Sequence, residues 1–215
     1  MTSLKDKAYT IVKDRIINCV YPPGSVLVEK DIIEEIAVSR TPFREAINAL
    51  SKEGLVEMLP RKGVFVKSIT LKDINDLYAV REINEPFALR LAMQHIPAIA
   101  LRQAYDNMER LQKTVGDGNM VEEENLHRLI LSYVDNRLLE RIMDDIYVQN
   151  HRLSVLCNKD EANLLETKRQ HLEIAKHMLE NDEDAAVHAM ENHIRSSKQR
   201  ALDCIMSSDY TIHIG

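Results

Sequence analysis

The sequence predicts a mostly α-helical protein in two parts, and three observations support this fold class. Apolar residues recur at helical spacing along most of the chain. Two short β-prone runs, 55–59 and 64–66, flank a turn that contains Pro60 and Gly63. From Thr70 onward, no further run favours a strand. We therefore expect a first domain over residues 1–69, with three helices and a β-hairpin, and an all-helical second domain over residues 70–215.

Three helices are expected before the hairpin. The first covers residues 4–16 and stops before the turn Tyr21-Pro22-Pro23-Gly24, because prolines and glycine end a helix. The second fits residues 29–36. The third begins at Ser39, whose hydroxyl suits a helix N-terminus, and ends at Gly54. Its apolar face consists of Phe43, Ala46, Ile47 and Leu50.

The hairpin follows the third helix directly. Its two β-prone runs are joined by Pro60-Arg61-Lys62-Gly63, a turn with a basic tip. Three helices followed by a basic hairpin is the element order of a winged helix-turn-helix domain, in which the hairpin forms the wing. The sequence therefore predicts this architecture for residues 1–69.

The second part reads as a series of amphipathic helices. Thr70-Leu71-Lys72-Asp73 resembles a capping box at the start of the first of them. Breaks are expected at Pro97, at residues 116–119 and at residues 158–163. Pro86 lies inside the first helix and is expected to kink it or split it, because proline lacks the amide hydrogen that the helix uses.

Composition excludes several classes of protein. No apolar run approaches the roughly 18–20 residues that span a bilayer, and the N-terminus lacks the apolar core of a signal peptide, so we expect a cytoplasmic protein without membrane contact. Cys19, Cys157 and Cys204 are widely separated and form no Cys-x-x-Cys motif. We therefore expect neither a disulfide framework nor a thiolate zinc site, and treat the cysteines as reduced packing residues.

Charge is unevenly distributed between the two parts. Residues 1–69 contain 11 Lys and Arg against 9 Asp and Glu, whereas the remainder contains 17 against 25. The chain thus joins a mildly basic domain to an acidic one, although its overall net charge is −6. A basic first domain is compatible with nucleic acid as a partner.

The cations of the first domain cluster where a winged helix-turn-helix domain contacts DNA. Arg40, Thr41 and Arg44 lie in the first turn of the third helix, with Ser39 before it. The N-terminal turn of such a helix enters the major groove, where arginine can donate two hydrogen bonds to guanine and hydroxyls can meet phosphates. The wing tip Arg61-Lys62-Gly63 is expected to follow the backbone or the minor groove.

These motifs resemble a known family. Pro23-Gly24 and the run VSRTPFREAINALSKEGLVEMLPRKGVFV, residues 38–66, are similar to the GntR family signature. VREINEPFALRLA, residues 80–92, resembles the opening helix of the FCD domain found in the FadR subfamily. The resemblance implies that Arg40 and Arg44 read bases and that Lys30 contacts phosphate. Ala37 replaces the usual turn glycine, which implies a turn residue without positive φ.

Histidines supply the candidate sensor site. Glu123 and His127 are four residues apart on a predicted helix, so both can face one ion. His171 and His193 lie on two later predicted helices. Neutral imidazoles with a carboxylate suit zinc or nickel. Spacing alone leaves open whether the three helices converge, and the alternative is a cavity with polar histidines and no ion.

The resemblance extends to this site. Metal-binding FCD domains use an Asp, a His four residues later and two His on the last helices, which implies Glu123, His127, His171 and His193 as metal ligands, with Glu in place of Asp. Arg81 matches the family's first-helix arginine and is expected to bind a carboxylate effector at the metal. An alternative partner for Arg81 is Glu85, four residues later.

These expectations combine into one function. We expect a homodimer that binds palindromic double-stranded operator DNA, since two related recognition helices read more base pairs than one. A small organic acid bound in the helical domain would control operator affinity, with repression relieved by the ligand. The alternatives are a metal-dependent helical enzyme, a metal-free sensor of a different ligand class and a helical interaction module. No catalytic signature favours the enzyme.

Overall fold

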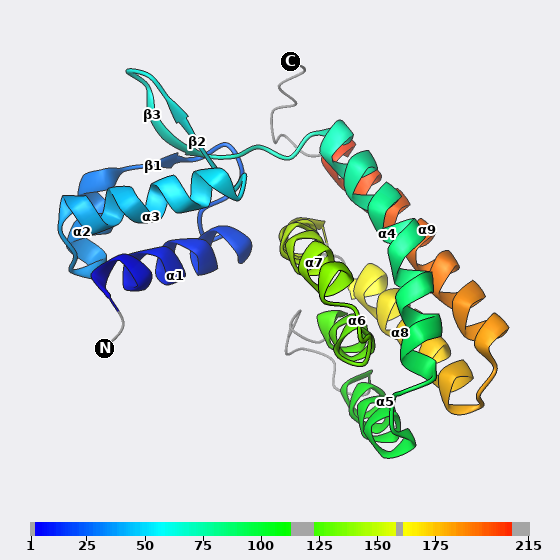
Figure 1. Cartoon of the computed structure of the whole chain (residues 1–215). Coiled ribbons are helices and arrows are strands. Elements are labelled where there is room, and N and C mark those ends of the chain that lie inside the picture. The colour runs from blue at the N-terminus through cyan, green and yellow to red at the C-terminus, as the bar shows by residue number, and fades with distance from the viewer. Residues whose placement is uncertain (1–2, 113–122, 158–160, 208–215) are drawn as a thin grey trace. The chain divides into compact units, whose positions relative to one another are not determined.

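The computed structural model describes residues 3–112, 123–157 and 161–207, except for the side chains of residues 111–112 and 123–125. The described chain forms two compact units, residues 3–70 and 71–207, shown in Figure 1. The fold is mostly helical, with an N-terminal helix-turn-helix unit and a helical C-terminal unit, as the sequence predicts. None of the described helices is long and apolar enough to cross a membrane.

The first unit contains the expected helices α1 (Leu4–Ile17), α2 (Glu29–Ile36) and α3 (Arg40–Lys52). The expected hairpin forms from β2 (Val56–Leu59) and β3 (Gly63–Val66). A short strand that the sequence analysis missed, β1 (Val26–Leu27), pairs antiparallel with β3 and gives the sheet order β1-β3-β2. The wing is therefore a three-stranded sheet, with the hairpin held at its base by β1.

Buried side chains hold these elements together. The four residues expected on the apolar face of α3 are all buried, and α1 contributes its own stripe at helical spacing, Ala8, Val12 and Ile16. At the end of α3, Gly54 adopts φ +70°, and the amide of Leu55 donates to the carbonyl of Leu50 at 3.0 Å. This is the glycine-terminated helix end that the sequence predicts.

The turn between α2 and α3 corrects one expectation. Ala37 has φ +52° and ψ +55°, so the turn does require a left-handed residue. Its amide donates to the carbonyl of Ile33, which ends α2 and turns the chain toward α3. The alanine thus adopts the conformation that the family's glycine would adopt, at the steric cost of a β-carbon in the left-handed region.

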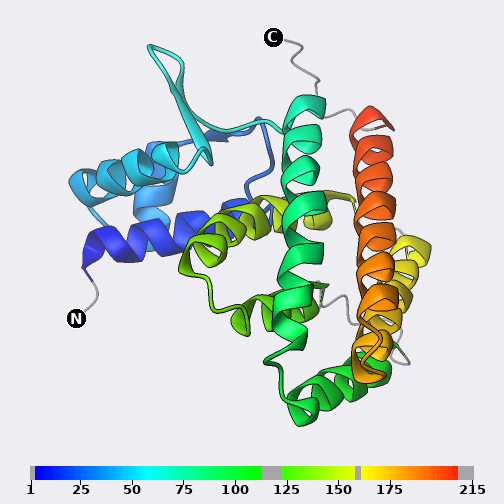
Figure 2. The same cartoon turned by 45° about the vertical axis from the view of Figure 1, so that its right-hand side comes forward.

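The described residues of the second unit form helices joined by turns and loops, without a strand. Its elements are α4 (Leu71–Met93), α5 (Ala98–Gln112), α6 (Glu123–Ser132), α7 (Arg137–Cys157), α8 (Glu161–Leu179) and α9 (Glu183–Ser207). The long helix α4 continues through Pro86 and is not split by it. In Figures 1 and 2, α4 and α9 run side by side, and α9 also packs against α8 and α7.

The core of this unit contains polar groups among apolar ones. Ile74, Leu89, Ile174 and Ile194 are fully buried, as expected for amphipathic helices. Among the side chains that the structure describes, eight polar or charged ones are buried with them, Arg81, Glu85, His127, Arg152, Thr167, Gln170, His171 and His193. A buried charge or imidazole is costly unless it is paired, so this concentration points to a site.

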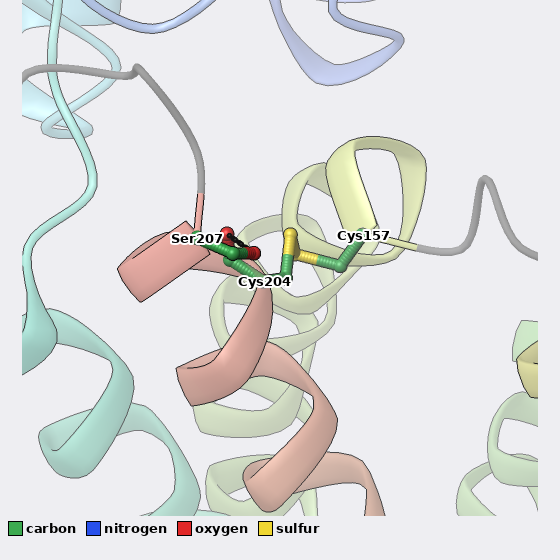
Figure 3. Close-up of a disulfide and its surroundings, with 3 residues drawn as sticks. All are labelled: Cys157, Cys204 and Ser207. Carbon is green, nitrogen blue, oxygen red and sulfur yellow. Dashed lines mark hydrogen bonds between the residues drawn. A yellow bond between two sulfur atoms is a disulfide. The ribbon is translucent and has the colours of Figure 1, made fainter.

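A disulfide overturns the expectation that all three cysteines are reduced. Cys157, the last residue of α7, is bonded to Cys204 of α9, with the two α-carbons 5.5 Å apart (Figure 3). The two residues are 47 positions apart in the chain, so spacing gave no sign of the pairing. Cys19, in the first unit, takes no part in this disulfide.

We predict that Ala37→Gly stabilises the first unit. Relief of the left-handed strain, ~1–2 kcal/mol, exceeds the added entropy of the unfolded glycine, ~0.5–1 kcal/mol, so the free energy of unfolding should rise by about 0.5–1 kcal/mol. Urea unfolding followed by circular dichroism measures the change. The control is Ala49→Gly within α3, which should lower stability. Destabilisation by both substitutions would contradict the strain at Ala37.

Candidate metal centre and nucleic-acid interface

The arginines expected to contact DNA lie at the surface of the first unit. Arg40 and Arg44 are one turn apart at the start of α3, and their side chains are 82% and 68% exposed. Both face Glu29 of α2, at nitrogen–oxygen distances of 3.8 and 3.4 Å. Exposed ion pairs contribute roughly 0–1 kcal/mol. DNA can therefore displace Glu29 from both guanidinium groups at little cost.

Three further polar residues are exposed near these arginines in the chain. Lys30 lies in the first turn of α2, and Thr41 follows Arg40 in α3. Ser39 is the N-cap residue of α3, as expected, but its side chain makes no capping hydrogen bond. A hydroxyl in that position can instead donate to a phosphate oxygen.

The wing tip is exposed and has an unusual backbone. Arg61 and Lys62, between β2 and β3, and Gly63, the first residue of β3, are all exposed. Arg61 has φ +64° and Gly63 has φ +114°, so a side chain at residue 63 would be strained. No heavy atom lies within 4 Å of the place where a β-carbon of residue 63 would stand. The backbone at Gly63 is thus open to close approach by a partner.

Three histidine side chains meet inside the second unit. His127 comes from α6, His171 from α8 and His193 from α9, and all three are buried. Nε2 of His171 lies 3.2 Å from Nε2 of His127 and 3.2 Å from Nε2 of His193. The helices that carry the three candidate histidines therefore converge, which was the point that spacing left open.

The neighbours of the three rings determine where their protons lie. Nδ1 of His193 lies 3.1 Å from Oε1 of Gln170, whose amide nitrogen donates to Glu166, so the Gln170 oxygen accepts a hydrogen bond from Nδ1–H of His193. Nδ1 of His127 lies 2.8 Å from Oε2 of Glu85, at hydrogen-bond distance but off the ideal direction. Each proton on Nδ1 leaves the Nε2 of the same neutral ring as a lone pair.

The Nε2 atoms of the three rings lie close together, but the neutral rings carry too few protons to form a hydrogen bond in every close contact. His171 Nε2 carries at most one hydrogen, yet it contacts both His127 Nε2 and His193 Nε2. Burial, with the neighbouring histidines, lowers the pKa of both His171 and His193 well below the ordinary value, which disfavours imidazolium. One close contact in the neutral cluster is therefore lone pair against lone pair, and a cation between the rings resolves it.

The geometry fits a divalent metal. Two nitrogens that each lie about 2.0–2.1 Å from one zinc ion are about 2.9–3.4 Å apart, which brackets the two contacts of His171. One ligand atom from each histidine lies within 4.8 Å of the others, so the three histidines could hold an ion. The side chain of Glu123, the expected fourth ligand, lies outside the described residues, although its backbone begins α6.

A buried ion pair supports His127 from α4. Glu85 lies between His127 and Arg81, whose Nε donates to Glu85 Oε1 at 2.5 Å. Arg81 also donates to the side-chain oxygen of Asn150 at 2.5 Å. Burial by itself would raise the pKa of Glu85, but Arg81 and His127 outweigh it and lower that pKa to about 2. Glu85 is therefore an anion that can orient the His127 ring toward a metal.

A cavity of about 30 Å³ adjoins the three histidines. This volume exceeds the roughly 10–15 Å³ needed for one water molecule, so ligand atoms can approach the histidines. Arg81 and Arg200 both line the cavity, and none of the described residues lining it is acidic. Thr167 and Ser197 also line the cavity, and the hydroxyl of each accepts a hydrogen bond from Arg200 at 3.0 Å.

Sequence reasoning missed two of the supporting residues. Glu85 was considered only as an alternative partner for Arg81, and the structure shows it bridging Arg81 and His127. Gln170, which accepts from His193, was not considered. A signal did exist for the first pair, because Arg81 and Glu85 both lie on the buried stripe of α4. Charged residues four apart on an apolar stripe indicate a buried ion pair.

Both units match known protein families. Residues 4–66 match the model of the "Bacterial regulatory proteins, gntR family", and residues 76–196 match the FCD domain. The HTH-type transcriptional repressor RspR of Escherichia coli is 24% identical over 196 residues, which cover 89% of this chain and 86% of that protein.

Two solved structures share the fold. A transcriptional regulator GntR from Rhodococcus sp. RHA1 has a TM-score of 0.76 at 20% identity, covering 93% of this chain and 97% of that one. The metal-free FCD domain of TM0439 has a TM-score of 0.56 at 17% identity, covering 66% of this chain and 99% of that one. The matched families are transcription regulators and not enzymes. The chain therefore belongs to the GntR family of helix-turn-helix regulators, in the FadR subfamily whose C-terminal unit is an FCD domain.

Proposed function

We propose that this regulator is a homodimeric, metal-containing repressor whose operator affinity falls when a small carboxylate binds in the FCD domain. The observation that carries the proposal is the set of three buried histidines whose Nε2 atoms face one another at 3.2 Å. We infer that operator release is the response because RspR, which covers most of this chain, is named a repressor.

The proposed metal is zinc or nickel. Imidazole nitrogens suit both ions, and His127, His171 and His193 would hold either, with Glu123 as a fourth ligand. Glu85 and Gln170 would keep the rings of His127 and His193 in the tautomer that offers Nε2. When bound, the metal would supply open coordination positions to an anionic ligand.

The proposed effector class follows from the charge of the cavity wall. Arg81 and Arg200 line the cavity, and the described lining residues include no Asp or Glu, although Glu85 neutralises Arg81 from outside the lining. A divalent ion adds further positive charge, so an organic acid is favoured over a neutral or cationic ligand. Arg81 already donates a hydrogen bond to Glu85. The effector carboxylate would bind Arg81 while the Arg81–Glu85 ion pair stays largely in place.

The proposed operator contact uses the exposed face of the first unit. Arg40 and Arg44 would read bases, while Lys30, Ser39 and Thr41 would contact phosphate. The wing tip Arg61-Lys62-Gly63 would follow the DNA backbone or the minor groove. A protein that reads chromosomal operators works in the cytoplasm, which is the location we propose.

A second copy of the chain would complete the DNA-reading unit. One recognition helix contacts only a few base pairs, whereas two related by a two-fold axis read a palindrome. On α4, Ile83 and Phe87 lie one turn apart and are 73% and 50% exposed. Large apolar side chains at this exposure suit contact between copies, and we assign this face to the homodimer.

We predict that the metal depends on the three histidines. Mass spectrometry of the untagged protein should find near-stoichiometric zinc or nickel, and His193→Ala should lose it, because two nitrogens hold the ion far more weakly than three. His188→Ala, an exposed histidine on the same helix, is the control and should retain the metal. Wild-type protein that stays metal-free after incubation with both ions would remove the metal from the proposed function.

A second prediction tests Glu85 as a positioning residue. Glu85→Gln keeps the shape of the side chain but removes the anion beside His127, so metal affinity should fall about 10–100-fold. Competition with a chelator measures the affinity, and the folded state is checked by circular dichroism. Glu82→Gln, on the exposed side of α4, should leave metal affinity unchanged. Equal affinities for Glu85→Gln and wild type would show that Glu85 does not act through His127.

A third prediction tests the regulator as a whole. An operator fragment, selected from random DNA with the wild-type protein, should bind Arg40→Ala and Arg44→Ala more weakly by about 1–3 kcal/mol each. Zinc together with citrate, as a probe carboxylate, should weaken wild-type binding by roughly 5–150-fold.

The control for operator binding is Lys52→Ala at the opposite end of α3, which should bind almost as wild type does. Wild-type affinity in both arginine variants would refute the proposed recognition helix. An operator affinity that no di- or tricarboxylate changes in the zinc-loaded protein would refute the proposed effector class.

A further inference from the structure

The disulfide of the second unit occupies a position that the proposed function does not use. Cys157 ends α7, and Cys204 lies in the last turns of α9, as Figure 3 shows. Ser207 donates to the carbonyl of Cys204 at 3.1 Å, within the final turn of the same helix. Both cysteines are partly exposed, and exposure is one of the conditions under which small thiols and oxidants react with cysteines.

The same bond lies at the wall of the sensor cavity. Cys157 itself lines the cavity, as does Ser154 one turn earlier on α7. From α9, Arg200 and Ala201 line it one turn before Cys204. The disulfide therefore joins the two helices that supply this part of the wall, and one of those helices also carries His193.

We propose that Cys157 and Cys204 form a reversible thiol–disulfide switch that sets the conformation of the cavity wall between α7 and α9. Its regulatory meaning rests on the sensor function proposed above. A DNA-binding regulator works among thiols that keep most cysteines reduced, and disulfides in that setting are typically transient and redox-sensing. A partly exposed pair with its α-carbons 5.5 Å apart can close and open without moving the backbone of either helix far.

The chemistry is thiol–disulfide exchange with a low-molecular-weight disulfide such as glutathione disulfide. One protein thiolate attacks a sulfur of the small disulfide, forms a mixed disulfide and releases one small thiol. The second protein thiolate then attacks the protein sulfur of the mixed disulfide and releases the second small thiol. Two protein thiols are thus oxidised with loss of two protons and two electrons, and one small disulfide is reduced to two thiols.

Apolar packing remains when the bond opens. Leu153 and Leu156 of α7 and Ile205 of α9 are buried, so the reduced unit keeps its fold. Reduction removes the side-chain cross-link between α7 and α9. The last turn of α7 is then held by noncovalent packing, including that of buried Leu156, and the wall formed by Ser154 and Cys157 gains freedom. Ligand affinity in the cavity should therefore differ between the two redox states.

Counting thiols by alkylation and mass spectrometry tests whether the bond forms and reverses. After equilibration of the full chain with glutathione disulfide, neither Cys157 nor Cys204 should be labelled under denaturing conditions or carry a glutathione adduct, and all three cysteines should be labelled after reduction. Stepwise change of the ratio of glutathione to its disulfide should convert one form to the other at ratios found in cells. Three labelled thiols at every ratio, or a bond that no ratio reduces, would overturn the switch.

Hydrogen exchange tests the effect on the cavity wall without metal or effector. In the reduced protein, amides of residues 150–157 and 198–207 should exchange at least several-fold faster than in the oxidised protein, while residues 40–52 stay unchanged. Cys157→Ser should match the reduced wild type under both conditions, and Cys19→Ser should match the wild type in each. Equal exchange in the two redox states of the wild type would show that the bond does not control the wall.

These readouts separate the switch from the proposed function. Thiol counting and hydrogen exchange can succeed when zinc and citrate fail to bind, and the metal predictions can succeed when the disulfide fails to form. In the zinc-loaded protein, the dissociation constant for citrate should differ at least several-fold between the redox states. Identical constants, with citrate bound in both states, would overturn the regulatory role of the pair.

Discussion

The burial of ionisable groups inside a helical bundle is the constraint on which the sensor unit depends. Arg81 and Glu85 neutralise each other on α4, and Glu85 in turn holds the Nδ1 side of His127. Neither charge could stay in the core alone, because an isolated buried ion costs several kcal/mol. The pair therefore places a fixed anion beside the His127 ring. Without this anion, apolar packing alone would orient the ring. With it, the ring can present a preorganised nitrogen to a metal.

The same constraint explains how the two units can differ so much in their surfaces. In the first unit the apolar residues of α1 and α3 fill the core, so Arg40 and Arg44 remain outside, paired only loosely with Glu29. Such weak pairs suit a partner that is bound and released. In the second unit the polar groups are inside, where their contacts are short and largely shielded from solvent. Low exposure strengthens these contacts and makes each of them costly to lose.

Much of the fold could be predicted because periodicity and end signals are local. The bounds of α2, the buried face of α3, its end at Gly54 and the helical nature of residues 71–207 in their described part all followed from short stretches of sequence. The exceptions also have local causes. The strand β1 is too short to show a pattern, and Ala37 adopts positive φ because the turn geometry overrides the preference of alanine.

For the candidate site, the sequence and the tertiary structure determined different features. Sequence by itself determined the family, the helices that carry His127, His171 and His193, and the clustering of Arg40 and Arg44 at one helix start. Only the tertiary structure decided that the three rings meet, that Glu85 and Gln170 hold two of them, and that Cys157 reaches Cys204. The physical reason is that helical periodicity specifies which face of a helix is buried, whereas the packing of all the helices specifies which residues on those faces come into contact.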